Sequence, residues 1–276
     1  MFSSAVQPPL VSLLSSTGSD PLALFSLHTD DMLASDSCVC LLKDSTSLPH
    51  PPPPATLVSL GEEYEPDRSN YKLDQTVLHI QSPTLRSTYI QCPPLGWSSC
   101  GRGTHMRRDG LGIEHPWIHL QVRYLHREWS FEVGIVDQSR REGIVRCSTF
   151  QKEPQLKLGK RPLLHLPLAF PSLSSRPLTS WSTVTLNLPS LLPHFSSASL
   201  VRKEYEHEDA DQDGTLVSRD MPQGLDAIGK AAVPSGTYSH VSYVKVYATC
   251  RLRRIYFTEN GPRQETPWEF GLYAAD

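Results

Sequence analysis

The sequence predicts an all-β fold, in which two antiparallel sheets form a jelly-roll-like β-sandwich with one or two short helices. Many short runs alternate apolar and polar residues with a period of two, the pattern of a strand with one buried face. Polar turn residues separate these runs, and no segment carries a long apolar stripe with helical period. Short strands with almost no helix argue for a sandwich or barrel and against a parallel α/β fold.

The middle of the chain contains the clearest strands. Residues 117–124, 129–135 and 143–149 alternate regularly, and polar segments connect them, so we expect an antiparallel meander. Further strands are expected at 77–80, 88–92, 163–166, 183–188 and, as a strand pair, 241–257. The short helices are expected at 10–15 and 198–206.

We expect a single domain over residues 1–276, diluted by flexible insertions. The chain holds 24 prolines in 276 residues, and its hydrophobic fraction of 38% is modest. Stretches rich in Pro, Ser, Gly or acidic residues interrupt the strand pattern, and such stretches usually lie on the surface of a domain. The expected insertions are about 30–67, 97–109, 171–177 and 196–236.

Composition also limits the class of partner and the cellular compartment. A formal net charge of -3 argues against bulk nucleic-acid binding. No apolar run is long enough to span a bilayer, and the N-terminus lacks the features of a signal peptide, so we expect an intracellular protein without membrane contact. In that reducing environment the six scattered cysteines are expected to be free thiols.

Three arginines form the most distinctive local feature. Arg251, Arg253 and Arg254 lie between a strand-like run and a second β-branched and aromatic run. Guanidinium groups on a rigid strand suit carboxylates and phosphates, so this segment is a candidate docking surface. Two alternatives stay open: the arginines form a solvated face, or they pair with nearby acidic residues.

An acidic stretch offers a candidate calcium loop. Four carboxylates at the spacing of an EF-hand loop could converge on Ca²⁺, and Gly214 stands at the position of the sharp turn. However, Pro222 and Gly224 interrupt the helix that should follow, and a plain acidic insertion explains the same residues. We therefore expect no metal and no cofactor. The four carboxylates are Asp209, Asp211, Asp213 and Asp220.

Other site signals are weaker. His115 and His119 lie four residues apart, but on a strand rather than a helix, so a structural or solvated role is expected. No nucleophile elbow, phosphate loop or metalloprotease motif is present, and we expect no enzyme. The tryptophans at 117, 129, 181 and 268 could build a sugar-binding platform, although Trp129 shares a strand face with Phe131 and is expected in the core.

Two strings are characteristic of a known family. Thr88-Tyr-Ile-Gln-Cys-Pro93 and Cys250-Arg-Leu-Arg-Arg-Ile-Tyr-Phe257 occur in order with further matching pieces, and together they resemble the cilia- and flagella-associated protein 20 family. The chain departs from the family pattern at Phe25, where a tryptophan is usual, at Pro189 and Pro193 in a short helix, and in the insertion at 196–236. The further pieces are 1–2, 12–22, 111–113, 129–133, 181–188 and 269–273.

This resemblance implies a β-sandwich without catalytic activity and a structural role in the axoneme of cilia and flagella. It implies tubulin and other inner-junction proteins as partners, with the A- and B-tubules of doublet microtubules bridged at their inner junction. It also implies localisation to the cytoplasm, cytoskeleton, axoneme or basal body, and the family is associated with nuclear roles. Tubulin surfaces are acidic, so six arginines could supply complementary charge. They are Arg251, Arg253, Arg254, Arg140, Arg141 and Arg146.

The tubulin contact can be tested, and two alternative functions stay open. Reversing the charge of Arg251 and Arg253 is expected to weaken microtubule binding while leaving the fold intact. A β-sandwich that binds carbohydrate or another ligand is the first alternative, and an exposed aromatic platform would favour it. A nuclear adaptor with the same fold is the second alternative, and cellular localisation would distinguish it.

Overall fold

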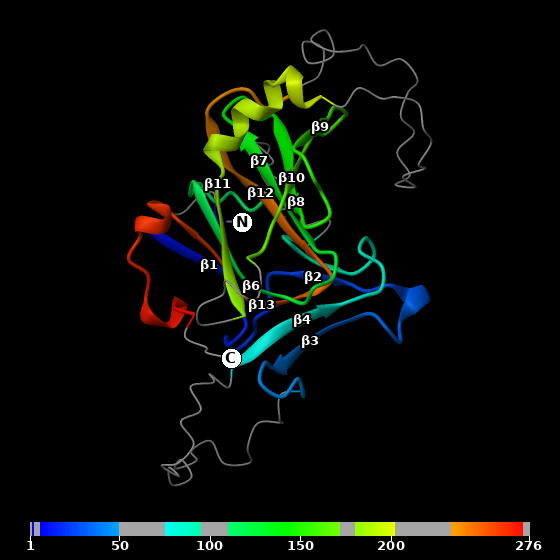
Figure 1. Cartoon of the computed structure of the whole chain (residues 1–276). Coiled ribbons are helices and arrows are strands. Elements are labelled where there is room, and N and C mark those ends of the chain that lie inside the picture. The colour runs from blue at the N-terminus through cyan, green and yellow to red at the C-terminus, as the bar shows by residue number, and fades with distance from the viewer. Residues whose placement is uncertain are drawn as a thin grey trace, which may run out of the picture.

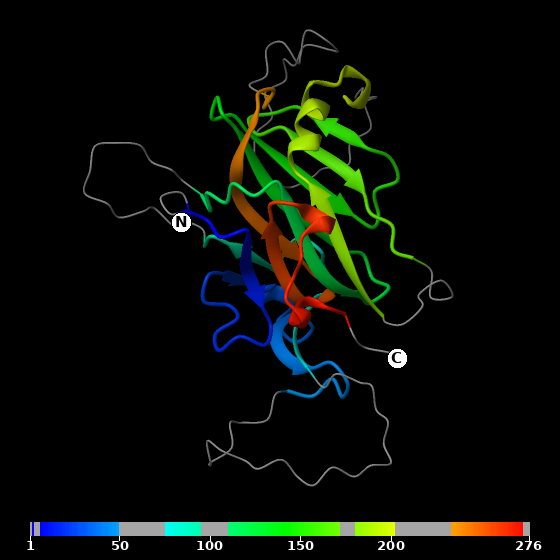
Figure 2. The same ribbon diagram turned by 90° about the vertical axis from the view of Figure 1, so that its left-hand side faces the viewer.

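Two β-sheets pack face to face and enclose one main hydrophobic core (Figures 1 and 2). The computed structural model describes residue 2 and residues 6–49, 75–94, 110–171, 180–201 and 233–272. Almost all neighbouring strands are antiparallel, and β8 and β10 form a parallel pair. The predicted β-sandwich is therefore confirmed.

Sheet A has β13 at its centre. Its strands follow the order β11-β6-β13-β4-β3, and β1 pairs with the second half of β13. The bounds are β1 Leu10–Ser15, β3 Cys38–Lys43, β4 Thr76–Gln81, β6 Trp117–Tyr124, β11 Trp181–Asn187 and β13 Cys250–Thr258. Both ends of β13 are thus flanked by partner strands on both sides.

Sheet B contains β7 and β8 of the predicted three-strand meander, but the first predicted strand, β6, pairs with β11 and β13 in sheet A, so the meander prediction is wrong for that strand. Its strands follow the order β2-β5-β12-β7-β8-β10-β9, with β7 and β8 joined by a tight turn. The bounds are β2 Ser26–His28, β5 Tyr89–Cys92, β7 Ser130–Asp137, β8 Glu142–Ser148, β9 Gln155–Lys157, β10 Leu163–Pro167 and β12 Tyr238–Tyr247. β12 lies between β5 and β7 and so joins the β7–β8 pair to the β2–β5 side of the sheet.

Alternation along the strands builds the core. Trp129, Phe131 and Phe257 are fully buried between the sheets, which confirms the expected core position of Trp129. In β13 the residues between the arginines, such as Leu252, point inward. A bulge between Leu252 and Arg254 places two successive arginines on the outer side of sheet A.

The helices are short 3₁₀ segments. η3 (Pro189–Ser196) closes one end of the core with Leu192 and Phe195, so the short helix expected from the family pattern forms despite Pro193. The remaining segments are η1 (Asp31–Leu33), η4 (Ala198–Leu200), η5 (Gly261–Arg263) and η6 (Trp268–Phe270). No helix among the described residues is long and apolar enough to cross a membrane.

Two further local predictions are wrong. Residues 10–15 form strand β1 rather than a helix, because pairing with β13 satisfies their backbone and buries Val11 and Leu13. The segment 30–67 begins with η1 and β3 rather than irregular chain, because β3 pairs along its whole length with β4. Of the helix expected at 198–206, η4 covers three residues and the part from 202 lies outside the described residues. Residues 50–67, 97–109, 172–177 and 202–232 also lie outside them.

Candidate partner-binding surfaces

The six candidate arginines do not form one surface. Arg251, Arg253 and Arg254 lie on the outer face of sheet A, whereas Arg146 lies in sheet B beside Glu132. Arg140 and Arg141 belong to the turn between β7 and β8 and its exit into β8. Because the two sheets pack through their inner faces, their outer faces point in opposite directions (Figure 2).

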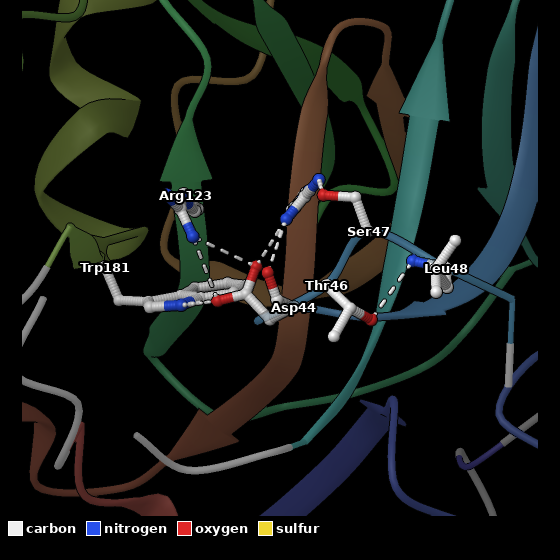
Figure 3. A network of polar contacts seen from close by, with 7 residues as sticks. Asp44, Thr46, Ser47, Leu48, Arg123 and Trp181 are labelled. Carbon is white, nitrogen blue, oxygen red and sulfur yellow. Dashed lines mark hydrogen bonds and ion pairs between the residues drawn. The ribbon is translucent and has the colours of Figure 1, made fainter. Parts of the chain in front are cut away.

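A single carboxylate holds Arg251 in place. Arg251 Nη1 donates to Asp44 Oδ1 at 2.8 Å and to the Asp44 carbonyl at 3.0 Å. The same carboxylate lies 3.2 Å from Arg123 Nη1 and accepts the indole N–H of Trp181 at 2.9 Å, and Figure 3 shows Arg123 and Trp181 converging on Asp44. Arg251 Nη2 donates to Ser47 Oγ at 2.6 Å. Asp44 therefore links the end of β3 to β6, β11 and β13.

The other two arginines of β13 lie under residues 261–272, which we call the C-terminal segment. Arg253 Nη1 donates to the carbonyl of Gly271 at 2.8 Å, and the Arg254 guanidinium lies 4.6 Å from the centroid of the Phe270 ring. Figure 2 shows this segment, in red, across the face of sheet A. Arg253 and Arg254 are only 5% and 7% exposed.

Burial corrects one expectation about these arginines. A carboxylate in place of Arg251 would face Asp44, and one in place of Arg253 would face backbone carbonyl oxygens. Like charges and opposed acceptors at buried positions destabilise a fold. The expectation that both charges can be reversed without disturbing the fold is therefore wrong, and the alternative of pairing with a nearby acid describes Arg251.

Glu132 organises the outer face of sheet B. Its carboxylate is 5% exposed and accepts from Arg146 Nε at 2.7 Å. The hydroxyls of Tyr247 and Tyr243 donate to its two oxygens at 2.9 and 3.1 Å. Burial opposes charge on Arg146, but Glu132 together with Tyr247 and Tyr243 outweighs it, and the pKa of the guanidinium is raised. Arg146 is thus a fixed cation whose side chain stays 35% exposed.

Two further cations are held against tyrosine rings on this sheet. Lys245 Nζ lies 3.6 Å from the centroid of the Tyr89 ring and 4.6 Å from that of Tyr247. Arg161 lies 5.3 Å from the centroid of the Tyr243 ring, and its Nε contacts Glu142 at 3.0 Å. Strand register places Lys245, Glu132 and Arg146 side by side across β12, β7 and β8. These contacts restrict the side chains before any partner binds.

The turn from β7 into β8 adds two more cations. Arg140 is exposed and has a positive φ of 62°. Arg141 Nε pairs with the buried carboxylate of Asp137 at 3.1 Å. Burial opposes ionisation of Asp137, but amide donors from Arg141, Gly236 and Ser235 outweigh it and lower the pKa of that carboxyl. We define the sheet B basic face as Arg140, Arg141, Arg146, Arg161 and Lys245.

The histidines have structural roles, as predicted. His115 is buried and bonds through its two ring nitrogens to Gln7 and to the carbonyl of Pro8. His119 lies between the hydroxyls of Thr185 and Thr258. Within the described residues no group of three His, Cys, Asp or Glu side chains could hold a metal, and the acidic loop from Asp209 to Asp220 lies outside them. The five described cysteines are free.

His119 predicts an acid sensitivity of the fold. Burial lowers the pKa of His119 to about 4, below an ordinary histidine value of about 6.5. Because the unfolded chain binds the proton first as the pH falls, stability should decrease between pH 6.5 and 4 by about 2 kcal/mol from this residue. Chemical denaturation at pH 7 and 4.5 measures the decrease, which should shrink in a His119→Gln variant. An identical decrease in that variant would exclude His119 as its source.

Comparison with known proteins identifies the family that this chain resembles. A model of the CFA20 domain matches residues 67–202. Cilia- and flagella-associated protein 20 of Chlamydomonas reinhardtii is 23% identical over 205 residues, which cover 73% of this chain and 75% of the relative. The proteins of the same name from Caenorhabditis elegans and Caenorhabditis briggsae are each 21% identical over 206 residues, or 73% of this chain and 71% of each relative. The chain is a divergent member of the CFA20 family.

The match to the CFA20 domain runs from just before β4 to just after η4. It therefore includes β7 and β8, with Glu132, Arg146 and the turn that carries Arg140. β12 and β13 follow the acidic insertion and lie beyond the matched range, yet they complete both sheets through pairing with β7 and β6. The fold of this CFA20-family chain thus depends on residues outside the recognised range.

The tryptophans of this CFA20-family protein do not build a sugar platform. Trp129 is fully buried, and Trp181 is 7% exposed with its indole N–H bound to Asp44. Trp117 packs against Gly261, where an added Cβ would come within 2.4 Å of its ring. Of the four candidate tryptophans, Trp268 alone is among the exposed large apolar residues, at 72%. One exposed ring does not form a stacking surface.

Sequence reasoning missed the two acidic residues that organise these faces. Asp44 follows β3 in a segment that was expected to be irregular, so nothing in the pattern connected it with Arg251. Glu132 did carry a signal, because it is a charged residue between Phe131 and Val133 in a strongly apolar run. A charged side chain in such a run needs a partner, and Arg146 in the next strand is the one that the antiparallel register provides.

Proposed function

We propose that this protein is a non-enzymatic structural component of the cilium or flagellum. In this proposal it binds the acidic surface of tubulin in doublet microtubules and helps to bridge the A- and B-tubules at their inner junction. The family membership supports the ciliary assignment, since the relatives are named as cilia- and flagella-associated proteins. The observation that carries the contact is the sheet B basic face, with Arg146 fixed by Glu132.

The physical support is preorganised positive charge. Arg146 and Lys245 are held by a carboxylate and by aromatic rings, so little side-chain entropy remains to be lost on binding. Glu132 is buried beneath these cations and does not present its charge to a partner. Electrostatic complementarity with an acidic protein surface would orient the encounter and make it sensitive to salt.

The sugar-binding alternative has less support. The tyrosines of sheet B are rings that could stack on a ligand, but Tyr89 contacts His28 and Lys245, and Tyr247 and Tyr243 bind Glu132. These rings are committed to contacts within the sheet. We therefore favour a charged docking surface over an aromatic ligand platform.

Microtubule co-sedimentation tests the proposal. Replacing Arg140 and Arg146 by glutamine should weaken binding about three- to tenfold, and the loss should be greatest at low salt. A variant with Arg127→Gln and Lys152→Gln is the matched control, because it removes the same charge from exposed positions outside the sheet B basic face. Far-UV circular dichroism and thermal unfolding should confirm that both variants fold. Equal weakening in the two variants would contradict a specific role for the sheet B basic face.

A further inference from the structure

Positive charge exceeds negative charge on the outer face of sheet A. Arg123 and Arg251 share Asp44, which among the described residues is the one carboxylate within ion-pair distance of the guanidinium groups on this face. Arg253 and Arg254 have neutral hydrogen-bond acceptors, although both are more than nine-tenths buried. Burial, reinforced by the charge of Arg254, lowers the pKa of Arg253 despite the opposing effect of Asp44.

Several buried donors on this face lack an acceptor. The Nε atoms of Arg251, Arg253 and Arg254 are buried and have no hydrogen-bond partner within the part of the chain that the structure describes. An unsatisfied buried donor on a charged group is costly, and native structures contain few of them. Each guanidinium therefore uses only part of its donor fork. A carboxylate can accept from Nε and Nη of one fork at once.

The C-terminal segment contacts Arg253 and Arg254 through neutral groups, and the charge of Glu269 in the same segment also acts on Arg254. The carbonyl oxygens of Glu269 and Gly271 accept from Arg253, and that of Phe270 accepts from Gln121. Its other backbone hydrogen bonds are local, such as Phe270 N–H to the carbonyl of Pro267. Most of the segment is exposed, and it is anchored by two apolar side chains. These are Phe270, which contacts Tyr256 and Arg254, and Leu272, which packs on a small cluster with Trp181.

We propose that the C-terminal segment is a displaceable cover over an anion-binding face formed by Arg253 and Arg254. The occupant is an acidic peptide segment of a partner protein, whose carboxylates take the place of the backbone carbonyls. Exchange of neutral acceptors for carboxylates creates charge-assisted hydrogen bonds and supplies partners for the free Nε atoms. The energy of these bonds offsets the release of Phe270 and Leu272 from the sheet.

The chemistry favours an acidic peptide over a nucleic acid. The acceptors now present come from three successive residues of one peptide chain, so the face already accommodates an extended polypeptide. The inference concerns sheet A and does not depend on the proposed contact between sheet B and tubulin.

Fluorescence anisotropy with a short fluorescein-labelled oligoglutamate peptide tests the proposal on the full chain. The peptide binds only those molecules in which the cover is open, so its apparent affinity is the intrinsic affinity multiplied by the open fraction. Phe270→Ala removes an anchor of the cover and raises that fraction, so it should tighten binding about five- to tenfold. Trp268→Ala, a change in the same segment at an exposed ring, should leave affinity unchanged. Adding Arg253→Gln and Arg254→Gln to the Phe270→Ala variant should remove the gain in affinity. Adding Arg140→Gln and Arg146→Gln to the same variant should leave the gain unchanged.

Amide hydrogen exchange tests whether peptide binding displaces the C-terminal segment. Binding of the peptide should increase exchange of the amides of Phe270 and Gly271, which are hydrogen-bonded in the covered state. Absence of peptide binding to the Phe270→Ala variant would overturn the proposal. Cooperative thermal unfolding of that variant shows that it is folded, so misfolding cannot explain the absence of binding. Unchanged exchange in the C-terminal segment, or tighter binding of an oligothymidine of equal charge, would overturn it as well.

Discussion

Replacing Asp44 by alanine is expected to lower the free energy of unfolding by about 3 kcal/mol. The change leaves the buried Arg251 guanidinium without its ion-pair partner, and it removes acceptors from Arg123 and the Trp181 indole. Breaking a buried pair by removing one partner costs more than the pair contributes, because an uncompensated charge remains in a poorly solvated site. Urea denaturation of the wild type and the variant measures the difference.

Two controls separate this effect from a general loss of charge. Asp36→Ala removes a carboxylate from an exposed position just before β3, at the other end of that strand from Asp44, and should change stability by less than about 0.5 kcal/mol. Combining Asp44→Ala with Arg251→Met should recover part of the loss, because no buried cation is then left unpaired. Additive losses in the double variant would show that the two residues do not interact.

Replacing Phe257 by alanine is expected to lower the free energy of unfolding by about 4 kcal/mol. Phe257 is fully buried on β13, and β1 and β6 flank it in sheet A, so the surrounding side chains can collapse only partly into the cavity. Phe150→Ala makes the same chemical change at a side chain that is 41% exposed and should cost about 1 kcal/mol or less. A loss in Phe257→Ala no larger than in Phe150→Ala would contradict the position of β13 at the centre of sheet A.

Local pattern predicted most of the strands but not their partners. Period-two alternation located β6, β7, β8 and β11 within a few residues, because one face of each strand is packed on the core. β1 and β3 were missed because their regular structure depends on pairing with β13 and β4, which are distant in the sequence. The pattern of neighbouring residues does not indicate which distant strand a segment pairs with.

The arginines of β13 show a second limit. A solvated face was one of the alternatives for these arginines, because an outward-facing charge on a sheet is ordinarily solvated. The sequence contains no local sign that residues 261–272 return across that face, or that Asp44 approaches from the β3–β4 connection. By contrast, the pairing of Arg146 was predictable, because Glu132 and Arg146 are opposite each other in the β7–β8 hairpin.

The cations of the two sheets therefore differ in their exposure and in their partners. On sheet B the cations are fixed by local partners and remain partly exposed, as at Arg146. On sheet A the cations are buried under a segment that supplies neutral acceptors. The first arrangement is suited to docking on an extended acidic surface, and the second requires a rearrangement before it can bind an anion.

Co-sedimentation with microtubules across a salt series tests the central claim most directly. The measurement compares the wild type with the Arg140→Gln, Arg146→Gln variant, on intact microtubules and on microtubules whose acidic tails have been removed by proteolysis. We predict binding of the wild type that weakens as salt increases, and a three- to tenfold weaker affinity of the variant on intact microtubules. Absence of wild-type binding at low salt, or equal affinity of the folded variant under every condition, would contradict the proposed docking of the sheet B basic face on tubulin.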